Sequence, residues 1–126
     1  MNSLILCGLI LSLLFWSAAV PSPIELTTDK AIYKPGEEVH IRIKNISSKV
    51  LRGSITLTIK DEKGKIVDEL VILLDWPPLK PGEAIRHKWN QKGRVDGYGQ
   101  VSEGKYILTS SGEGYKVSKE IEITTP

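Results

Sequence analysis

From residue 24 onward, apolar and polar side chains alternate along the chain in short runs. Val39, Ile41 and Ile43 occupy one face of a predicted strand, and polar side chains occupy the positions between them. The same period of two returns in four further segments, residues 54–60, 85–90, 105–110 and 115–124. A period of two is typical of antiparallel strands that have one buried and one wet face. The pattern therefore predicts a chain built from short antiparallel strands.

Two regions depart from this simple alternation. Residues 66–74 (IVDELVILL) are too apolar for a strand with one fully wet face. A strand covered on both sides fits the preceding turn at 61–64, and a helix is the alternative. Residues 24–28 and 32–33 alternate on either side of Asp29-Lys30 and predict a first strand in two parts.

The sequence Lys-Pro-Gly-Glu occurs twice, at residues 34–37 and 80–83. Proline fixes φ at about −65° and glycine accepts a positive φ, as a type II turn requires at its second and third residues. Each copy precedes an alternating segment, so Pro35, Gly36, Pro81 and Gly82 are predicted to be structural residues that start strands.

Turns separate seven or eight predicted strands, and no segment has the length and pattern of a crossover helix between parallel strands. Trp76-Pro77-Pro78 ends one strand, because neither proline can donate to a ladder. A second hairpin is predicted around residues 111–114. The fold class is predicted to be all-β, an immunoglobulin-like antiparallel sandwich over residues 23–126.

The first twenty residues have a different character. Leu4 to Val20 is an almost unbroken apolar run, and Pro21-Ser22-Pro23 follows it. A helix of this length spans about 25 Å, slightly less than the hydrocarbon core of a bilayer. Residues 1–22 are therefore predicted to be a signal peptide, with Ser17 and Ala19 before the cleavage site, or an N-terminal membrane anchor. Either alternative predicts a secreted or exocytoplasmic membrane-anchored protein.

Composition excludes several kinds of chemistry. Cys7 is the single cysteine and lies in the apolar run, so the exported part has no disulfide, thiolate nucleophile or zinc-thiolate site. The net charge is +2, and basic and acidic residues are interspersed along the chain, which argues against a nucleic-acid-binding protein. His40 is predicted to face outward and His87 inward, and neither has an evident set of further metal ligands. We expect no metal, no cofactor and no enzymatic activity, because no nucleophile or base is placed by a third group.

One long irregular segment interrupts the predicted strands. Residues 91–103 (QKGRVDGYGQVSE) contain three glycines and no sustained alternation. Long loops on a rigid scaffold commonly carry binding residues. The candidate protein-contact residues are Gln91, Lys92, Arg94, Asp96 and Tyr98.

Two further motifs are predicted to have structural or modification roles. Tyr106 follows Gly104 by two residues at the start of a late strand, which matches the tyrosine corner of Greek-key sandwiches. Asn45-Ile46-Ser47 is a glycosylation sequon at a strand end, so Asn45 is a glycosylation candidate in an exported domain.

Taken together, these segments resemble the intracellular proteinase inhibitor (BsuPI) family of bacteria and archaea. The resemblance covers residues 24 to about 124 and rests on ordered segments, namely Thr28-Asp29-Lys30, Tyr33 to Glu37, Lys44-Asn45, Leu79 to Glu83, Trp89 to Lys92 and Gly104-Lys105-Tyr106. The pair Trp89-x-Gln91 followed by a loop and Gly-x-Tyr is its most specific part.

The resemblance implies an immunoglobulin-like sandwich and a non-catalytic protein that binds or inhibits a serine protease through the loop 91–103. Because the chain begins with an export segment, its target would lie outside the membrane. The alternative is a structural or adhesive module at the cell surface that binds protein or glycan and has no inhibitory activity.

Overall fold

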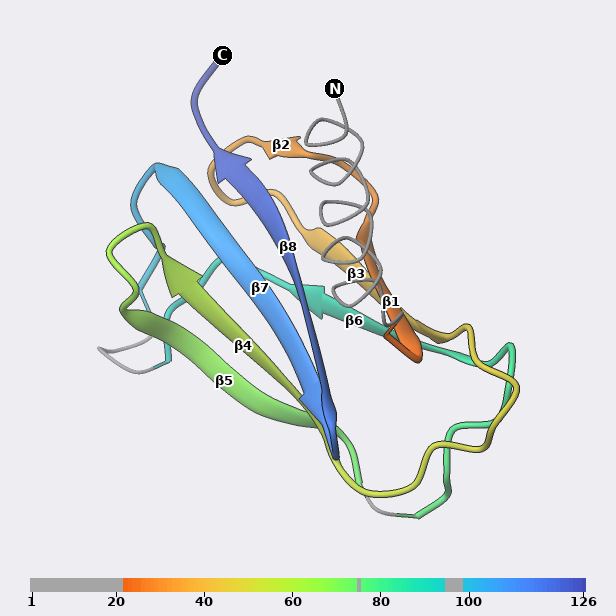
Figure 1. Ribbon diagram of the computed structural model, residues 1–126. Coiled ribbons are helices and arrows are strands. Elements are labelled where there is room, and N and C mark those ends of the chain that lie inside the picture. Colours follow the sequence, from red (N-terminus) through yellow and green to blue (C-terminus); the bar gives the residue numbers. More distant parts are fainter. Residues whose placement is uncertain (1–21, 75, 95–98) are drawn as a thin grey trace, which may run out of the picture.

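The computed structural model describes residues 22–74, 76–94 and 99–126. All regular structure in these residues is β, as predicted, and it comprises eight strands (Figure 1). Their bounds are β1 Ile24–Thr28, β2 Ile32–Tyr33, β3 Val39–Asn45, β4 Ile55–Asp61, β5 Ile66–Leu73, β6 Ala84–Trp89, β7 Gly104–Gly112 and β8 Tyr115–Ile123. The apolar run at 66–74 thus contains a strand, β5, rather than a helix. The prediction that this strand is covered on both sides is wrong, because β5 is an edge strand and Val71 is exposed.

The strands form two sheets, as expected for a β-sandwich (Figure 1). The three-stranded sheet has the order β1-β3-β6, and the five-stranded sheet has the order β2-β8-β7-β4-β5. Every pairing is antiparallel except that of the short β2 with β8, which is parallel. The predicted split of the first strand is therefore a change of sheet, because β1 belongs to one sheet and β2 to the other.

The core lies between the two sheets and is built from the predicted apolar positions. On β3, Val39, Ile41 and Ile43 are buried, and the side chains between them are exposed or half-buried. Ile55, Leu57 and Ile59 of β4 are buried in the same alternating way. Removal of this apolar surface from water is the main driving force that holds the sheets face to face.

Each Lys-Pro-Gly-Glu segment forms a turn with glycine at positive φ, +82° at Gly36 and +81° at Gly82. The glutamate adds a contact that the turn pattern did not predict. Its backbone N–H donates to the lysine carbonyl, at 3.1 Å in the first turn and 3.0 Å in the second. Its carboxylate in turn accepts from the lysine N–H, at 3.0 Å from Lys34 and 2.7 Å from Lys80. All four residue types of the repeat thus serve the turn.

The tyrosine corner is confirmed. The Tyr106 hydroxyl donates to the Ser102 carbonyl at 2.6 Å, and the ring is buried. Trp89 packs edge-on against it, with ring centroids 5.9 Å apart and an interplanar angle of 61°. The corner therefore fixes where the segment 91–103 returns to β7.

Tyr106→Phe is expected to lower the free energy of unfolding by about 1.5 kcal/mol, because it leaves the Ser102 carbonyl without its partner. Tyr115→Phe is a matched control: its hydroxyl is buried without a hydrogen-bond partner among the described residues. We expect that variant to be neutral or slightly stabilising. Urea unfolding of both variants checks the difference, and equal losses would contradict the assignment.

Within the described residues, no helix is long and apolar enough to cross a membrane. The predicted signal peptide or anchor lies outside these residues except for Ser22.

Candidate functional site

The segment 91–103 is fastened to the sandwich at its base. Its two arms are joined by hydrogen bonds from the Val101 N–H to the Gln91 carbonyl at 2.9 Å and from the Gly93 N–H to the Gly99 carbonyl at 3.0 Å. The Arg94 N–H donates to the Val67 carbonyl on β5 at 2.8 Å. Lys92 and Gln100 also face each other as an isolated bridge. The base is therefore a short two-stranded ladder docked on β5, a feature that alternation alone did not reveal.

Gln91 does not serve as an exposed contact residue. Its side chain is fully buried, and its φ of 63° is unusual for a residue other than glycine. The side-chain amide donates to the carbonyls of Lys34 and Glu37, each at 2.8 Å, and its oxygen accepts from the Gly36 N–H at 3.0 Å. Gln91 thus joins the loop to the first Lys-Pro-Gly-Glu turn.

Lys92 has an exposed side chain on a fixed backbone. Its backbone N–H donates to the side-chain amide oxygen of Asn90 at 3.2 Å. Its carbonyl accepts from the Trp89 indole N–H, also at 3.2 Å. The Lys92 ammonium group is therefore presented to solvent from a backbone held on both sides.

Arg94 is exposed but points back to the body of the protein. Its Nε lies 3.9 Å from a carboxylate oxygen of Asp68, a residue of β5 that is 3% exposed. His87 on β6 lies at the same edge of the sandwich, and its side chain is half-buried. This burial is the main cause that lowers the pKa of its imidazole.

Of the other candidate contact residues, Asp96 and Tyr98 lie outside the described residues.

The sequon residue Asn45 is placed differently from the prediction. Its side chain is fully buried, and the amide nitrogen donates to the carbonyls of Lys49 at 2.8 Å and Leu79 at 3.0 Å. The Ser47 hydroxyl and N–H both donate to the amide oxygen of Asn45. A glycan replaces one of the two hydrogens on this nitrogen and would therefore remove at least one of these buried contacts. In the folded chain the Asn45 side chain instead links two loops.

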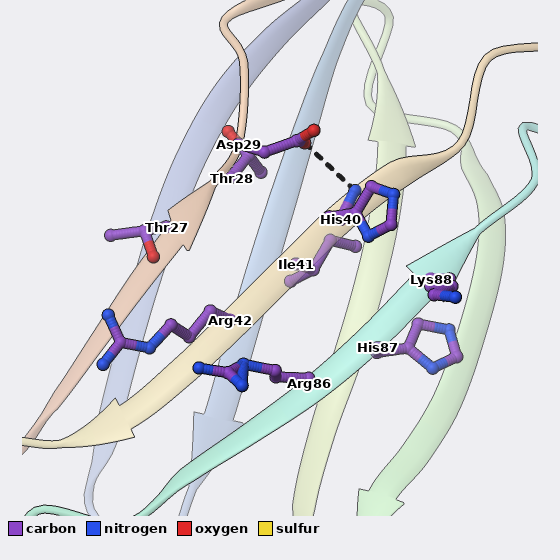
Figure 2. A pocket seen from close by; sticks show the side chains of 9 residues that line it. All are labelled: Thr27, Thr28, Asp29, His40, Ile41, Arg42, Arg86, His87 and Lys88. Carbon is purple, nitrogen blue, oxygen red and sulfur yellow. Dashed lines mark hydrogen bonds between the residues drawn. The ribbon is translucent and has the colours of Figure 1, made fainter.

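The outer face of the three-stranded sheet carries a groove of about 540 Å³ (Figure 2). His40 and Arg42 of β3 and Arg86 and Lys88 of β6 line it, together with Thr27, Thr28 and Asp29 at the end of β1. As predicted, His40 faces outward, and His87 faces inward on the adjacent position of β6. Basic residues that are dispersed along the sequence therefore gather on one face, a feature that the alternating pattern does not predict.

A second surface feature lies at the end of the sandwich at which β1 begins. Large apolar side chains are exposed on the two loops there: Ile46, Val50, Leu74 and Trp76, the last with 74% of its surface accessible. The Ile46 N–H donates to the Pro23 carbonyl at 2.9 Å, and Leu51 and Leu79 join the two loops by backbone hydrogen bonds, so both loops lie near the start of β1.

The loop 91–103 lies at the opposite end of the sheets. Ile24 pairs with Asn45 at one end of β3, and Trp89 pairs with Val39 at the other end. Residues 91–94, which follow β6 after Asn90, therefore lie at the end of the sandwich opposite to the start of β1 (Figure 1).

Comparisons with known proteins find similarity in fold only. No family model matches the chain, and no curated protein matches it. Among solved structures, a cycloisomaltooligosaccharide glucanotransferase from Paenibacillus sp. superposes with a TM-score of 0.61 and 18% identity over 83% of this chain. A β-glucosidase from Listeria innocua gives 0.51 and 17% over 82%. The alkylpurine DNA glycosylase AlkC from Pseudomonas fluorescens gives 0.52 and 12% over 82%.

These similarities concern one part of much larger proteins. The chain covers 14% of the glucanotransferase, 16% of the β-glucosidase and 31% of the glycosylase. At such identities they support the sandwich architecture and carry no activity across. Within the described residues, no group of three or more His, Cys, Asp or Glu side chains is placed to hold a metal ion.

Proposed function

We propose that the chain is a non-catalytic, immunoglobulin-like binding module that engages an extracytoplasmic serine protease through the segment 91–103. The observation that carries the proposal is the anchoring of this segment to β5 and, through Gln91, to the first turn. A protease inhibitor of the substrate-like kind needs an exposed stretch held by a rigid scaffold, because pre-organisation reduces the entropy lost on binding. The sequence resemblance to BsuPI inhibitors supports the same class of partner.

Lys92 is the residue best suited to contact the partner. Its exposed ammonium group and doubly held backbone suit insertion into an acidic specificity pocket. Arg94 is a weaker candidate, since its guanidinium group is already directed at the Asp68 carboxylate.

The position of the segment also favours a partner in solution or at a distance from the membrane. In a chain retained by an N-terminal anchor, Trp89 and the start of the loop would lie at the end of β3 opposite to Ile24, the strand residue nearest to that anchor in sequence. A secreted chain would present the loop equally well.

The test is a titration of serine proteases secreted by the same source with the full chain, purified in mild detergent. We expect micromolar protein to slow hydrolysis and Lys92→Ala to weaken inhibition at least about tenfold, which corresponds to about 1.4 kcal/mol. Arg94→Ala is expected to have a smaller effect. Lys116→Ala, which removes an exposed lysine from β8, is the matched control and should inhibit like the parent chain.

Two results would contradict the proposal. Unchanged hydrolysis rates at micromolar protein would exclude inhibition of the proteases tested. Equal losses for Lys92→Ala and Lys116→Ala would show that inhibition depends on general charge and not on the loop.

The second candidate is a cell-surface module that binds protein or glycan without inhibition. The exposed Trp76 and the exposed Leu74 and Ile46 on loops at the same end of the sandwich favour it, because exposed aromatic and apolar side chains are typical of recognition surfaces. This candidate predicts that Trp76→Ala abolishes retention on isolated cell envelopes and that Lys92→Ala leaves retention unchanged.

A further inference from the structure

The outer face of the three-stranded sheet contains two consecutive cross-strand pairs of basic residues. Arg42 of β3 lies opposite Arg86 of β6, and two residues along the same strands His40 lies opposite Lys88. Figure 2 shows the side chains of Arg42 and Arg86 extending over the same face from neighbouring strands. Like charges directly opposite each other, such as the guanidinium groups of Arg42 and Arg86, destabilise an antiparallel pair. The chain therefore carries a local arrangement that opposes its own folding.

The acidic groups around the groove do not compensate for this arrangement. Within the described residues, Arg42, Arg86 and Lys88 form no ion pair, and the Arg42 Nε is buried without a hydrogen-bond partner. The Asp29 carboxylate accepts from the Tyr33 hydroxyl and from the His40 N–H at 3.2 Å. The Glu38 carboxylate lies 3.9 Å from His40 Nε2 and reaches neither arginine. In the part of the chain that the structure describes, the two guanidinium groups thus share one groove, and neither forms an ion pair with the Asp29 carboxylate that also lines it.

We propose that this groove binds a phosphoryl group that carries two negative charges, such as a phosphomonoester or pyrophosphate. Arginine matches phosphate oxygens with two parallel N–H donors, and one dianion neutralises both guanidinium groups at once. A single carboxylate neutralises only one of them. Lys88 and the hydroxyl of Thr27 lie on the same groove and supply further donors. Clustered residues that lower local stability are typical of functional sites, where selection for binding outweighs stability.

The lining of the groove argues against two other classes of ligand. Neutral sugars and single-stranded nucleic acids are bound largely by stacking on aromatic rings. Apart from the two histidines and the acidic Asp29, the groove residues are basic, hydroxyl-bearing or aliphatic, and no Trp, Tyr or Phe is among them. The charge and the hydroxyl groups therefore suit the phosphoryl group itself.

The test is a thermal-unfolding and calorimetric titration of the full chain with inorganic pyrophosphate, compared with chloride at equal ionic strength. Saturating pyrophosphate is expected to raise Tm by about 5 °C or more, since a ligand that binds only the folded state stabilises it. Arg86→Ala is expected to weaken pyrophosphate binding at least about tenfold. Without ligand the same variant should have an equal or higher Tm than the parent, because the substitution removes a like-charge pair. Lys116→Ala on the other sheet should bind as the parent does.

Further arms separate the sources of the phosphoryl group. If the parent chain binds vesicles that contain phosphatidic acid and Arg86→Ala does not, the ligand is a lipid headgroup. If the parent chain binds soluble pyrophosphate but not the vesicles, the ligand is soluble. Both results support the site. No binding of either probe, equal binding by Arg86→Ala, or tighter binding of poly-glutamate or an oligonucleotide than of pyrophosphate would overturn it.

Discussion

Gln91→Ala is expected to lower the free energy of unfolding by about 3 kcal/mol, because several polar groups around a fully buried side chain lose their partners together. The carbonyls of Lys34 and Glu37 would lose a donor, and the Gly36 N–H would lose an acceptor. The truncation would also leave a void between the loop and the first turn. Urea unfolding with a constant m-value measures the loss.

Asn90→Ala is the neighbouring control for this variant, since Asn90 is exposed. Among the described residues, its side chain accepts only the Lys92 N–H, at 3.2 Å, and we expect a loss below about 1 kcal/mol. If Gln91→Ala were no more destabilising than Asn90→Ala, Gln91 would not be the residue that fastens the loop.

Alkaline pH is expected to destabilise the fold through Tyr33. Burial and the hydrogen bond to Asp29 raise the pKa of the Tyr33 hydroxyl from 10.0 to about 12. Between these values the folded chain keeps a proton that the unfolded chain releases, so the free energy of unfolding falls as pH rises. This group lowers the free energy of unfolding by about 1.4 kcal/mol per pH unit, which amounts to about 2 to 3 kcal/mol between the two pKa values.

Tyr33→Phe separates this contribution from the titration of other groups. The variant loses the hydrogen bond to Asp29 and is expected to be less stable at neutral pH. Above about pH 10, the ordinary pKa of tyrosine, its free energy of unfolding should fall less steeply with pH than that of the parent. Burial also raises the pKa of Tyr115, so part of the slope remains in the variant. Identical slopes for the two chains would contradict the assignment to Tyr33.

The strands and the core were predictable because a single face of each strand is buried. Alternation placed Val39, Ile41 and Ile43 in the core, and the glycine and proline positions marked where strands begin. The tyrosine corner followed from local spacing alone, since the Tyr106 hydroxyl reaches a carbonyl only four residues upstream. Local pattern thus determines most of the strand architecture.

Features that depend on pairing between distant strands were not predictable. The groove exists because β3 and β6, separated by two strands in the sequence, lie side by side with Arg42 opposite Arg86. Alternation fixes which face a side chain occupies, but strand order decides which charges become neighbours. For this reason the interspersed charges of the sequence gave no sign of a basic face.

Two polar residues were misplaced for a related reason. Gln91 and Asn45 carry polar side chains in segments expected to be exposed, and both are fully buried. Each satisfies backbone groups of another loop, the 34–37 turn for Gln91 and the 49 and 79 carbonyls for Asn45. A buried amide is stable where it pairs with such groups, but the sequence does not show which loops will meet.

The most direct test of the proposed binding role is amide hydrogen exchange of the full chain with and without the secreted serine protease that it inhibits best. We expect slower exchange in residues 92–103 and at the Val67 edge of β5, with little change over the groove around Arg42 and Arg86. Exchange that is unchanged throughout, or slowed only at the end of the sandwich that carries Trp76, would contradict the claim that this segment is the contact surface.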